Sequence, residues 1–173
     1  MKAKALCFWV IGIWIFVASP LYALNSEINR TTLKGLRGVR VLVEDLAPEV
    51  EREGLVKEQL QKSVEERLRS AGIRVLTQDE AAKAPGEPYL YVNINISFAK
   101  GEEEICSYSI DVALIQNITL VRIPKQTSYA VTWSTGGVGL IGKKSLGELK
   151  GSVEEIVDIF VNAFFSVNPK KVP

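Results

Sequence analysis

The clearest pattern in this chain is a strict alternation of apolar and other side chains between residues 89 and 98. Successive side chains of an extended chain point to opposite faces, so a period of two is typical of a half-buried β-strand. One side carries Leu90, Val92, Ile94, Ile96 and Phe98, and the other carries Tyr89, Tyr91, Asn93, Asn95 and Ser97. The chain therefore has to build a sheet whose apolar face is covered.

Three further segments have the composition and alternation of strands. Residues 39–44 are rich in valine, residues 107–114 alternate again, and residues 128–134 combine β-branched and aromatic side chains. The last of these segments is expected to place Tyr129, Val131 and Trp133 on one side. Because the later strands are joined by short connections such as the charged segment 99–104, an antiparallel meander is predicted.

Two segments have the period of an amphipathic helix. Residues 55–71 carry an apolar residue at every fourth position from Leu60, and Gly72 follows as the expected left-handed residue at the helix end. A second apolar stripe spans residues 149–164, after the capping-box pattern Ser-x-x-Glu at residues 145–148. Residues 73–76 predict a short strand, which a right-handed crossover would place parallel to the first strand.

These elements combine into one domain of the α+β class. Residues 77–88 are expected to form a loop, so the order of elements is β-α-β-β-β-β-α. We predict a two-layer sandwich in which a mixed, mostly antiparallel sheet has both helices on one face. The domain is expected to span residues 36–168, after a flexible leader at residues 24–35 and before a tail at residues 169–173.

The first 23 residues have the features of a secretory signal peptide. Two lysines precede an unbroken apolar run over residues 5–18, Pro20 follows, and the small residue Ala23 stands at the expected cleavage site. The run is shorter than the ~20 residues that a spanning helix needs. We therefore expect a bacterial periplasmic or secreted protein after cleavage near Ala23. The alternative is an uncleaved anchor, the one case in which contact with a membrane is expected.

The composition excludes several kinds of catalytic and metal site. The chain has no histidine, so nucleophilic sites that use an imidazole base and zinc sites that use histidine are ruled out. Cleavage would leave Cys106 as the one cysteine, and we expect it to be a buried core thiol rather than part of a disulfide. The charges of the remaining chain nearly balance, which disfavours nucleic acid as a partner. We expect neither a cofactor nor an enzymatic activity.

Residues 135–145, TGGVGLIGKKS, are similar to a nucleotide-binding loop because Gly137, Gly139 and Gly142 form a G-x-G-x-x-G pattern. The dinucleotide fold needs a further parallel strand after the next helix, and only one helix remains before the chain ends. Lys144 also stands where a phosphate loop has the hydroxyl that holds magnesium. We therefore predict no nucleotide, and interpret the segment as a hinge or docking loop between the last strand and the last helix.

The segment SVEERLRSAGIRVL leads from a helix through Gly72 into a short strand, and long antiparallel strands and a closing helix follow. This order of elements, from Val39 to Phe165, resembles small bacterial envelope domains: the amino-terminal domain of the translocation protein TolB, the curli secretion lipoprotein and the lipopolysaccharide-assembly lipoprotein. The resemblance implies a periplasmic, non-catalytic part that docks on other envelope components. Unlike the lipoprotein members, the chain has no cysteine where a lipid would be attached.

The polar face of the sheet is the expected functional surface, since rings and amides suit a protein or a glycan. The predicted partner surface consists of Tyr89, Tyr91, Asn93, Asn95, Gly137 and Gly139. An ordinary solvated face of an antiparallel sheet is the alternative interpretation of this pattern. The expected function is that of an exported envelope accessory or adaptor domain that binds a protein partner. A domain that binds a small ligand or glycan through the polar sheet face is the alternative.

Overall fold

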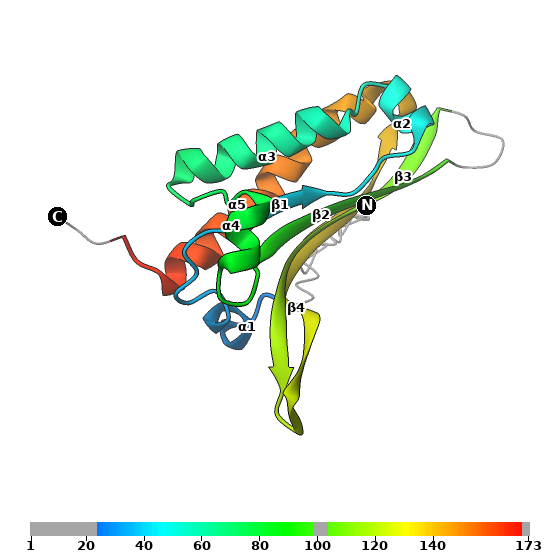
Figure 1. The fold of residues 1–173 in the computed structure, drawn as a ribbon. Helices are drawn as coiled ribbons and strands as arrows, with labels where there is room; N and C mark the ends of the chain where they lie inside the picture. Colours follow the sequence, from blue (N-terminus) through cyan, green and yellow to red (C-terminus); the bar gives the residue numbers. More distant parts are fainter. Residues whose placement is uncertain (1–23, 99–103, 171–173) are drawn as a thin grey trace, which may run out of the picture.

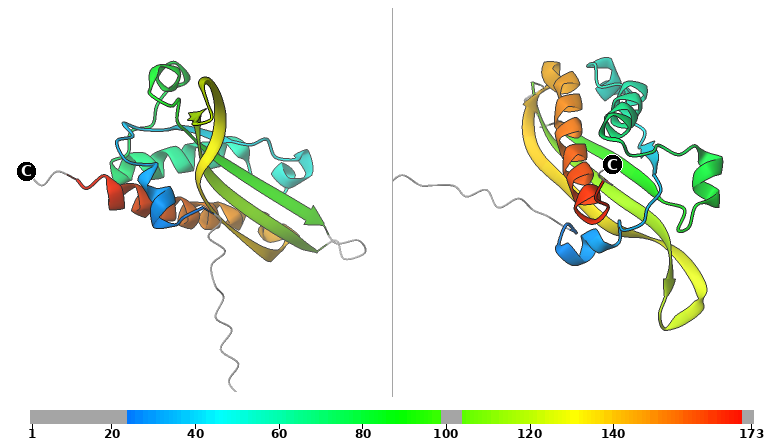
Figure 2. Two further views of the ribbon diagram at one scale, coloured as in Figure 1. Left: turned by 90° about the horizontal axis from the view of Figure 1, so that it is seen from below. Right: turned by 90° about the vertical axis from the view of Figure 1, so that its left-hand side faces the viewer.

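The computed structural model describes residues 24–98 and 104–170, and it shows a sheet that is covered on one face by helices (Figure 1). The strands are β1 (Arg40–Val43), β2 (Tyr89–Phe98), β3 (Ile105–Leu120) and β4 (Ile123–Gly142). They lie in this order in the sheet; β1 is parallel to β2, and the other neighbours are antiparallel. The long helices α3 (Lys57–Ala71) and α5 (Leu149–Val167) lie side by side on one face (Figure 2). The predicted α+β sandwich is confirmed.

The core lies between the sheet and these two helices, where the apolar periodicities predicted it. From α3, the residues Leu60, Val64 and Leu68 are at most 1% exposed. Trp133 of β4 packs edge-on against Phe160 of α5, with 5.2 Å between the ring centroids. The buried residues of the other strands and of α5 include Val41, Val43, Leu90, Val92, Ile94, Cys106, Ile110, Val112, Leu114, Val153, Val157 and Phe164. Cys106 is therefore a core thiol, as expected.

The short helical elements differ from the sequence-based expectations. The expected loop at residues 77–88 contains a helix whose capping box joins Thr77 and Glu80, because these side chains satisfy the first backbone N–H groups. The capping box expected at residues 145–148 is wrong: Ser145 lies inside a 3-10 helix, and α5 begins without a side-chain cap. The short elements are α1 (Glu27–Thr31), α2 (Pro48–Arg52), α4 (Gln78–Lys83) and η1 (Lys143–Glu148).

The crossover after α3 follows the prediction in direction but not in extent. Gly72 ends the helix in the left-handed conformation, with a φ of 92°. The chain then runs parallel to β1, where Val39 and Val75 form an isolated bridge. The expected strand at residues 73–76 is reduced to this one bridge, because the chain leaves the sheet again to begin α4 at Gln78.

Residues 24–35, expected to be a flexible leader, are part of the folded domain. They contain α1, and Leu33 behind it is completely buried. The amide of Asn168 donates a hydrogen bond of 2.9 Å to the carbonyl of Leu33, which ties this segment to the end of α5. The expectation was wrong because a few well-placed apolar groups, rather than a periodic pattern, hold the segment. The signal-peptide prediction for residues 1–23 lies outside the described residues.

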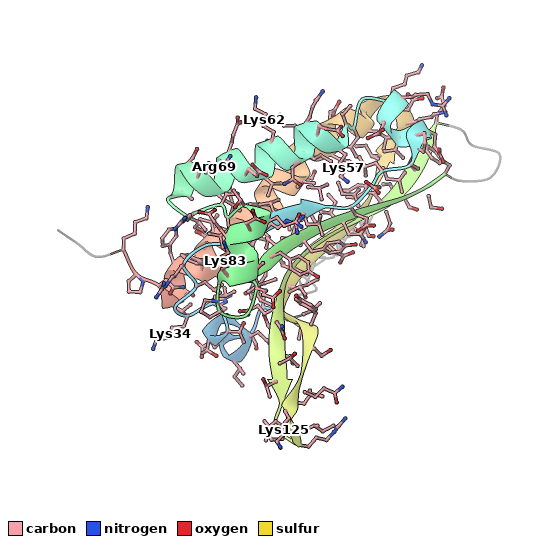
Figure 3. All side chains as sticks on the ribbon, in the orientation of Figure 1. Lys34, Lys57, Lys62, Arg69, Lys83 and Lys125 are labelled. Carbon is pink, nitrogen blue, oxygen red and sulfur yellow. The ribbon has the colours of Figure 1, made fainter. Side chains whose placement is uncertain are left out.

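Strands β3 and β4 are longer than predicted and extend beyond the body of the molecule as a hairpin. This hairpin, residues 116–131, is here called the arm, and Lys125 lies near its tip (Figures 1 and 3). Its residues show little alternation in burial, because most of their side chains are exposed on both faces. The sequence signal for a half-buried strand is therefore absent there. The turn expected at residues 99–104 falls almost wholly outside the described residues.

A β-bulge separates the arm from the body of the sheet. Leu114 pairs with Trp133 while Ile115 pairs with Val131, so Thr132 is an extra residue on β4. The bulge moves the strand by one position, so Trp133 is buried whereas Val131 and Tyr129 are exposed on the other face. The prediction that these three side chains share one side is therefore wrong.

Candidate docking surface

The candidate site is the face of the sheet that points away from α3 and α5, here called the outer face (Figure 2). The strand register brings side chains from three strands into rows across it. Asn95 of β2 pairs with Ser109 of β3, which in turn pairs with Val138 of β4. The amide of Asn95 lies 3.4 Å from the hydroxyl of Ser109, to which it donates a hydrogen bond. Tyr89, Tyr91, Asn93 and Asn95 share this face, as the alternation predicted.

A shallow hollow of about 570 Å³ lies on the outer face, toward the end where β4 meets η1. Val138 and Leu140 form one wall, and these two apolar side chains are 84% and 75% exposed. The polar side chains around the hollow are Asn95, Ser97, Ser107 and Ser109. The hollow therefore combines short hydrogen-bonding groups with an exposed apolar edge, which is the composition of a docking surface.

Of the two glycines predicted for this surface, Gly139 lines the hollow between Val138 and Leu140, whereas Gly137 does not. Both lie within β4, paired with Ile110 and Tyr108, and not in a loop. They point to the helix side: a Cβ at position 139 would lie 2.7 Å from the Tyr108 hydroxyl. At position 139, glycine therefore stands where the inner face is crowded. The extended, paired backbone also differs from the curved backbone that a phosphate loop needs.

Tyr91 is held at the end of β1 rather than offered to a ligand. Its hydroxyl donates a hydrogen bond to the carboxylate of Glu44, the residue that follows β1. This hydrogen bond and, to a smaller degree, burial raise the pKa of Tyr91 to about 12. The phenol therefore stays protonated at neutral pH and keeps its hydrogen bond to Glu44.

Tyr89 belongs to a cluster at the base of the arm. Its ring packs edge-on against Tyr129, with 6.2 Å between the centroids. The hydroxyl of Tyr129 and the amide of Asn117 each donate a hydrogen bond to one carboxylate oxygen of Glu87, at 2.5 and 3.0 Å. These two bonds lower the pKa of Glu87, and Glu87 itself adopts a rare positive φ of 44°. The cluster holds both strands of the arm and so fixes its direction.

A second hollow, of about 350 Å³, lies where β4 runs into η1 and contains Lys143 and Lys144. These are the lysines that the phosphate-loop pattern singled out. Lys143 is already paired: its Nζ lies 3.7 Å from a carboxylate oxygen of Glu53 and 5.7 Å from the centre of the Phe98 ring. Glu53 and Glu104 line the same hollow, so two carboxylates balance the two lysines and leave no excess of positive charge for an anion.

Two kinds of chemically reactive group were expected to be absent or buried, namely a metal cluster and a free thiol. Within residues 24–98 and 104–170, no three carboxylate or thiol side chains are grouped closely enough to hold a metal ion. Cys106 is fully buried, and this burial raises the pKa of its thiol, which disfavours the reactive thiolate.

Comparison with known proteins identifies no family for this chain. No family model matches the sequence, and no curated protein matches it either. A search of the described helices for a membrane span finds none that is both long and apolar enough.

Sequence reasoning found part of this surface and missed part of it. The alternation in residues 89–98 identified Asn95, because it showed which side chains face away from the core. Val138 and Leu140 were missed, since their segment was interpreted as a loop. The signal was present as a period of two, in which glycine alternates with Val138 and Leu140.

Proposed function

We propose that this chain is a non-catalytic, exported accessory domain of the bacterial envelope, and that it binds a protein partner through the outer face of its sheet. The observation that supports this proposal best is the exposure of Val138 and Leu140, at 84% and 75%, beside the polar groups of Asn95 and Ser109 on the outer face. Apolar side chains next to each other on a folded surface are a feature of interaction sites. Export rests on the signal-peptide pattern of residues 1–23.

The chemistry around these two residues suits a protein surface. A partner that covers the hollow would remove Val138 and Leu140 from water and could exchange hydrogen bonds with Asn95 and Ser109. Tyr91 and Tyr129 contribute less, because their hydroxyls already bind carboxylates within the chain. The docking surface is therefore centred on the β2–β4 rows near Asn95, not on the tyrosines.

A small-ligand or glycan-binding function is the second candidate, and the hollow of about 570 Å³ favours it. Its amide and hydroxyl groups could bind sugar hydroxyls, while Val138 and Leu140 would contact an apolar sugar face. A ligand of this kind would raise the melting temperature of the purified protein, whereas an adaptor would show no response to glycans or lipids.

Photo-crosslinking in intact cells separates these functions. A photoreactive amino acid at Asn95 would lie in the hollow, and the same residue at Lys62 would lie on the outer side of α3 as a matched control (Figure 3). We expect a defined protein to be captured from position 95 and not from position 62. If position 95 captures no protein while glycans raise the melting temperature, the second candidate replaces the first.

A further inference from the structure

The two edge strands of the sheet, β1 and β4, differ in how much of their outer backbone is hydrogen-bonded by other parts of the chain. At the β1 edge, the side-chain amide of Gln61 accepts a hydrogen bond from the N–H of Val43 and donates one to the carbonyl of Val41, both at 3.1 Å. Next to it, Val39 exchanges backbone hydrogen bonds of 3.0 and 2.9 Å with Arg74 and Leu76. The chain thus occupies this edge with its own groups, as natural proteins commonly do to prevent strand addition.

On β4, contacts of this kind occur at residues 132–134. The carbonyl of Thr132 accepts hydrogen bonds from the amide of Asn29 and the hydroxyl of Thr32, at 3.5 and 3.3 Å. Leu24 and Ser134 exchange two backbone hydrogen bonds, of 3.4 and 3.3 Å, in an antiparallel bridge. Ser134 therefore directs both its N–H and its carbonyl to the outside of the sheet. Because this direction alternates along a strand, Gly136, Val138 and Leu140 direct theirs outward too. Among the described residues, these three positions have no strand beside them on that side.

The composition of β4 is unusual for an edge strand. No charged residue occurs between Gln126 and Gly142, and no proline interrupts this stretch. Edge strands are normally protected by charge, proline or a bulge. The only bulge in this stretch lies at Thr132, before the outward-directed residues begin. Nothing in the side chains of residues 136–140 therefore opposes a second strand.

We propose that residues 136–140 of β4 pair antiparallel with the same residues of a second copy of this chain, around a two-fold axis at Val138. In that register Gly136 lies opposite Leu140 of the second copy, so the residue without a side chain leaves room for the large one. On the inner face Gly137 and Gly139 lie opposite each other, and no side chains collide. Each outward-directed pair exchanges two backbone hydrogen bonds.

The pairing joins two sheets into one and does not depend on the partner protein proposed above. Val138 and Leu140 of both copies would form one apolar cluster on the combined outer face. Stable interfaces bury at least ~1,200 Å². Two strands that pair over five residues each bury a smaller area. The dimer is therefore weak and depends on protein concentration.

Disulfide trapping of Val138→Cys tests the two-fold axis. Residues opposite each other in a hydrogen-bonded antiparallel pair have Cα atoms about 5.5 Å apart, a spacing that a disulfide spans. Mild oxidation is expected to convert most of this variant to a covalent dimer. Val131→Cys is the control, because Val131 is also exposed on β4 but lies outside the pairing. Its fraction of covalent dimer is expected to equal that of the wild type.

Light scattering over a range of concentrations tests the association without a covalent bond. The wild type is expected to change from monomer to dimer, and Val138→Lys to associate at least ~10-fold more weakly, because two like charges would then face each other. Val131→Lys and Val138→Thr should both behave as the wild type. A monomer at every concentration would overturn the proposal. Capture of a different protein at position 95 would leave the proposed function intact in that case.

Discussion

The indole N–H of Trp133 donates a hydrogen bond to the side-chain oxygen of Asn25, 3.0 Å away. This contact joins the largest fully buried side chain of the core to the second residue of the described chain. The same oxygen accepts a hydrogen bond of 2.8 Å from Arg30. The segment that the sequence suggested to be mobile thus provides the polar partner that a buried tryptophan requires.

Asn25→Ala is expected to destabilise the protein by about 1–3 kcal/mol, because it leaves the buried N–H of Trp133 without an acceptor. Glu27→Ala, at an exposed position in α1, should change the free energy of unfolding by less than about 0.5 kcal/mol. Urea unfolding of both variants measures the difference. Equal stability of the two would mean that residues 24–35 do not belong to the folded domain.

Gly136→Ala and Gly137→Ala are expected to have opposite effects on stability. A Cβ at position 136 would lie 2.4 Å from the backbone oxygen of Ile110, which cannot move aside without distorting the sheet. This substitution should cost about 1–3 kcal/mol. At position 137 the nearest atom is the end of Ile156, at an ordinary 3.7 Å. There alanine should be neutral or stabilise by up to ~1 kcal/mol. Thermal unfolding of both variants measures these effects. If the segment were a flexible loop, neither substitution would change the melting temperature.

Glu87 is expected to make the stability of the arm depend on pH in the acidic range. Hydrogen bonds from Tyr129 and Asn117 lower its pKa below the ordinary 4.5, so the folded state favours the carboxylate. This contribution is fully present above pH 4.5 and is lost as the pH falls through the lowered value.

Unfolding curves of the wild type and Glu87→Gln therefore should differ by a constant amount at neutral pH, and the difference should shrink below pH 4.5. Hydrogen exchange of the arm amides provides a local measurement of the same effect. A difference that stays constant down to the acid limit would show that the carboxylate does not hold the arm.

Gln61→Ala is expected to expose the β1 edge and to cost about 1–3 kcal/mol, since the N–H of Val43 loses its acceptor beside the core. Lys62→Ala, the adjacent exposed position on α3, should have almost no effect on the free energy of unfolding. We also expect folded Gln61→Ala to aggregate more readily than the wild type, because strand addition at the β1 edge is no longer blocked.

The parts of the fold that were predicted are those with a local apolar pattern. The alternation in residues 89–98 and the four-residue period from Leu60 located β2 and α3, since each pattern follows directly from which side chains are buried. The glycine-rich half of β4 was missed, because its glycines were interpreted as a loop although they alternate with Val138 and Leu140. The bulge at Thr132 then reversed the expected faces of Tyr129 and Val131, which no local pattern predicts.

The candidate surface was predictable to the same extent. Asn95 was identified as an outward residue from its own strand. Its neighbours Ser109 and Val138 are set by the register between strands, which depends on contacts that are distant in the sequence. Gln61 illustrates the same limit: its position on α3 identifies an exposed polar residue, and the packing of α3 against β1 turns it into the cover of a sheet edge.

The most direct test of the docking surface is to combine the photo-crosslinker at Asn95 with Leu140→Asp, which places a charge on the apolar wall of the hollow. Mass spectrometry would identify the captured protein and its yield in intact cells. If the outer face binds a protein partner, one defined protein should be captured by the wild-type surface, and its yield should fall ~10-fold or more with Leu140→Asp, as for a central interface residue. A yield that is unchanged by Leu140→Asp would contradict a docking surface on the outer face. The absence of a captured protein both with and without Leu140→Asp would also contradict it.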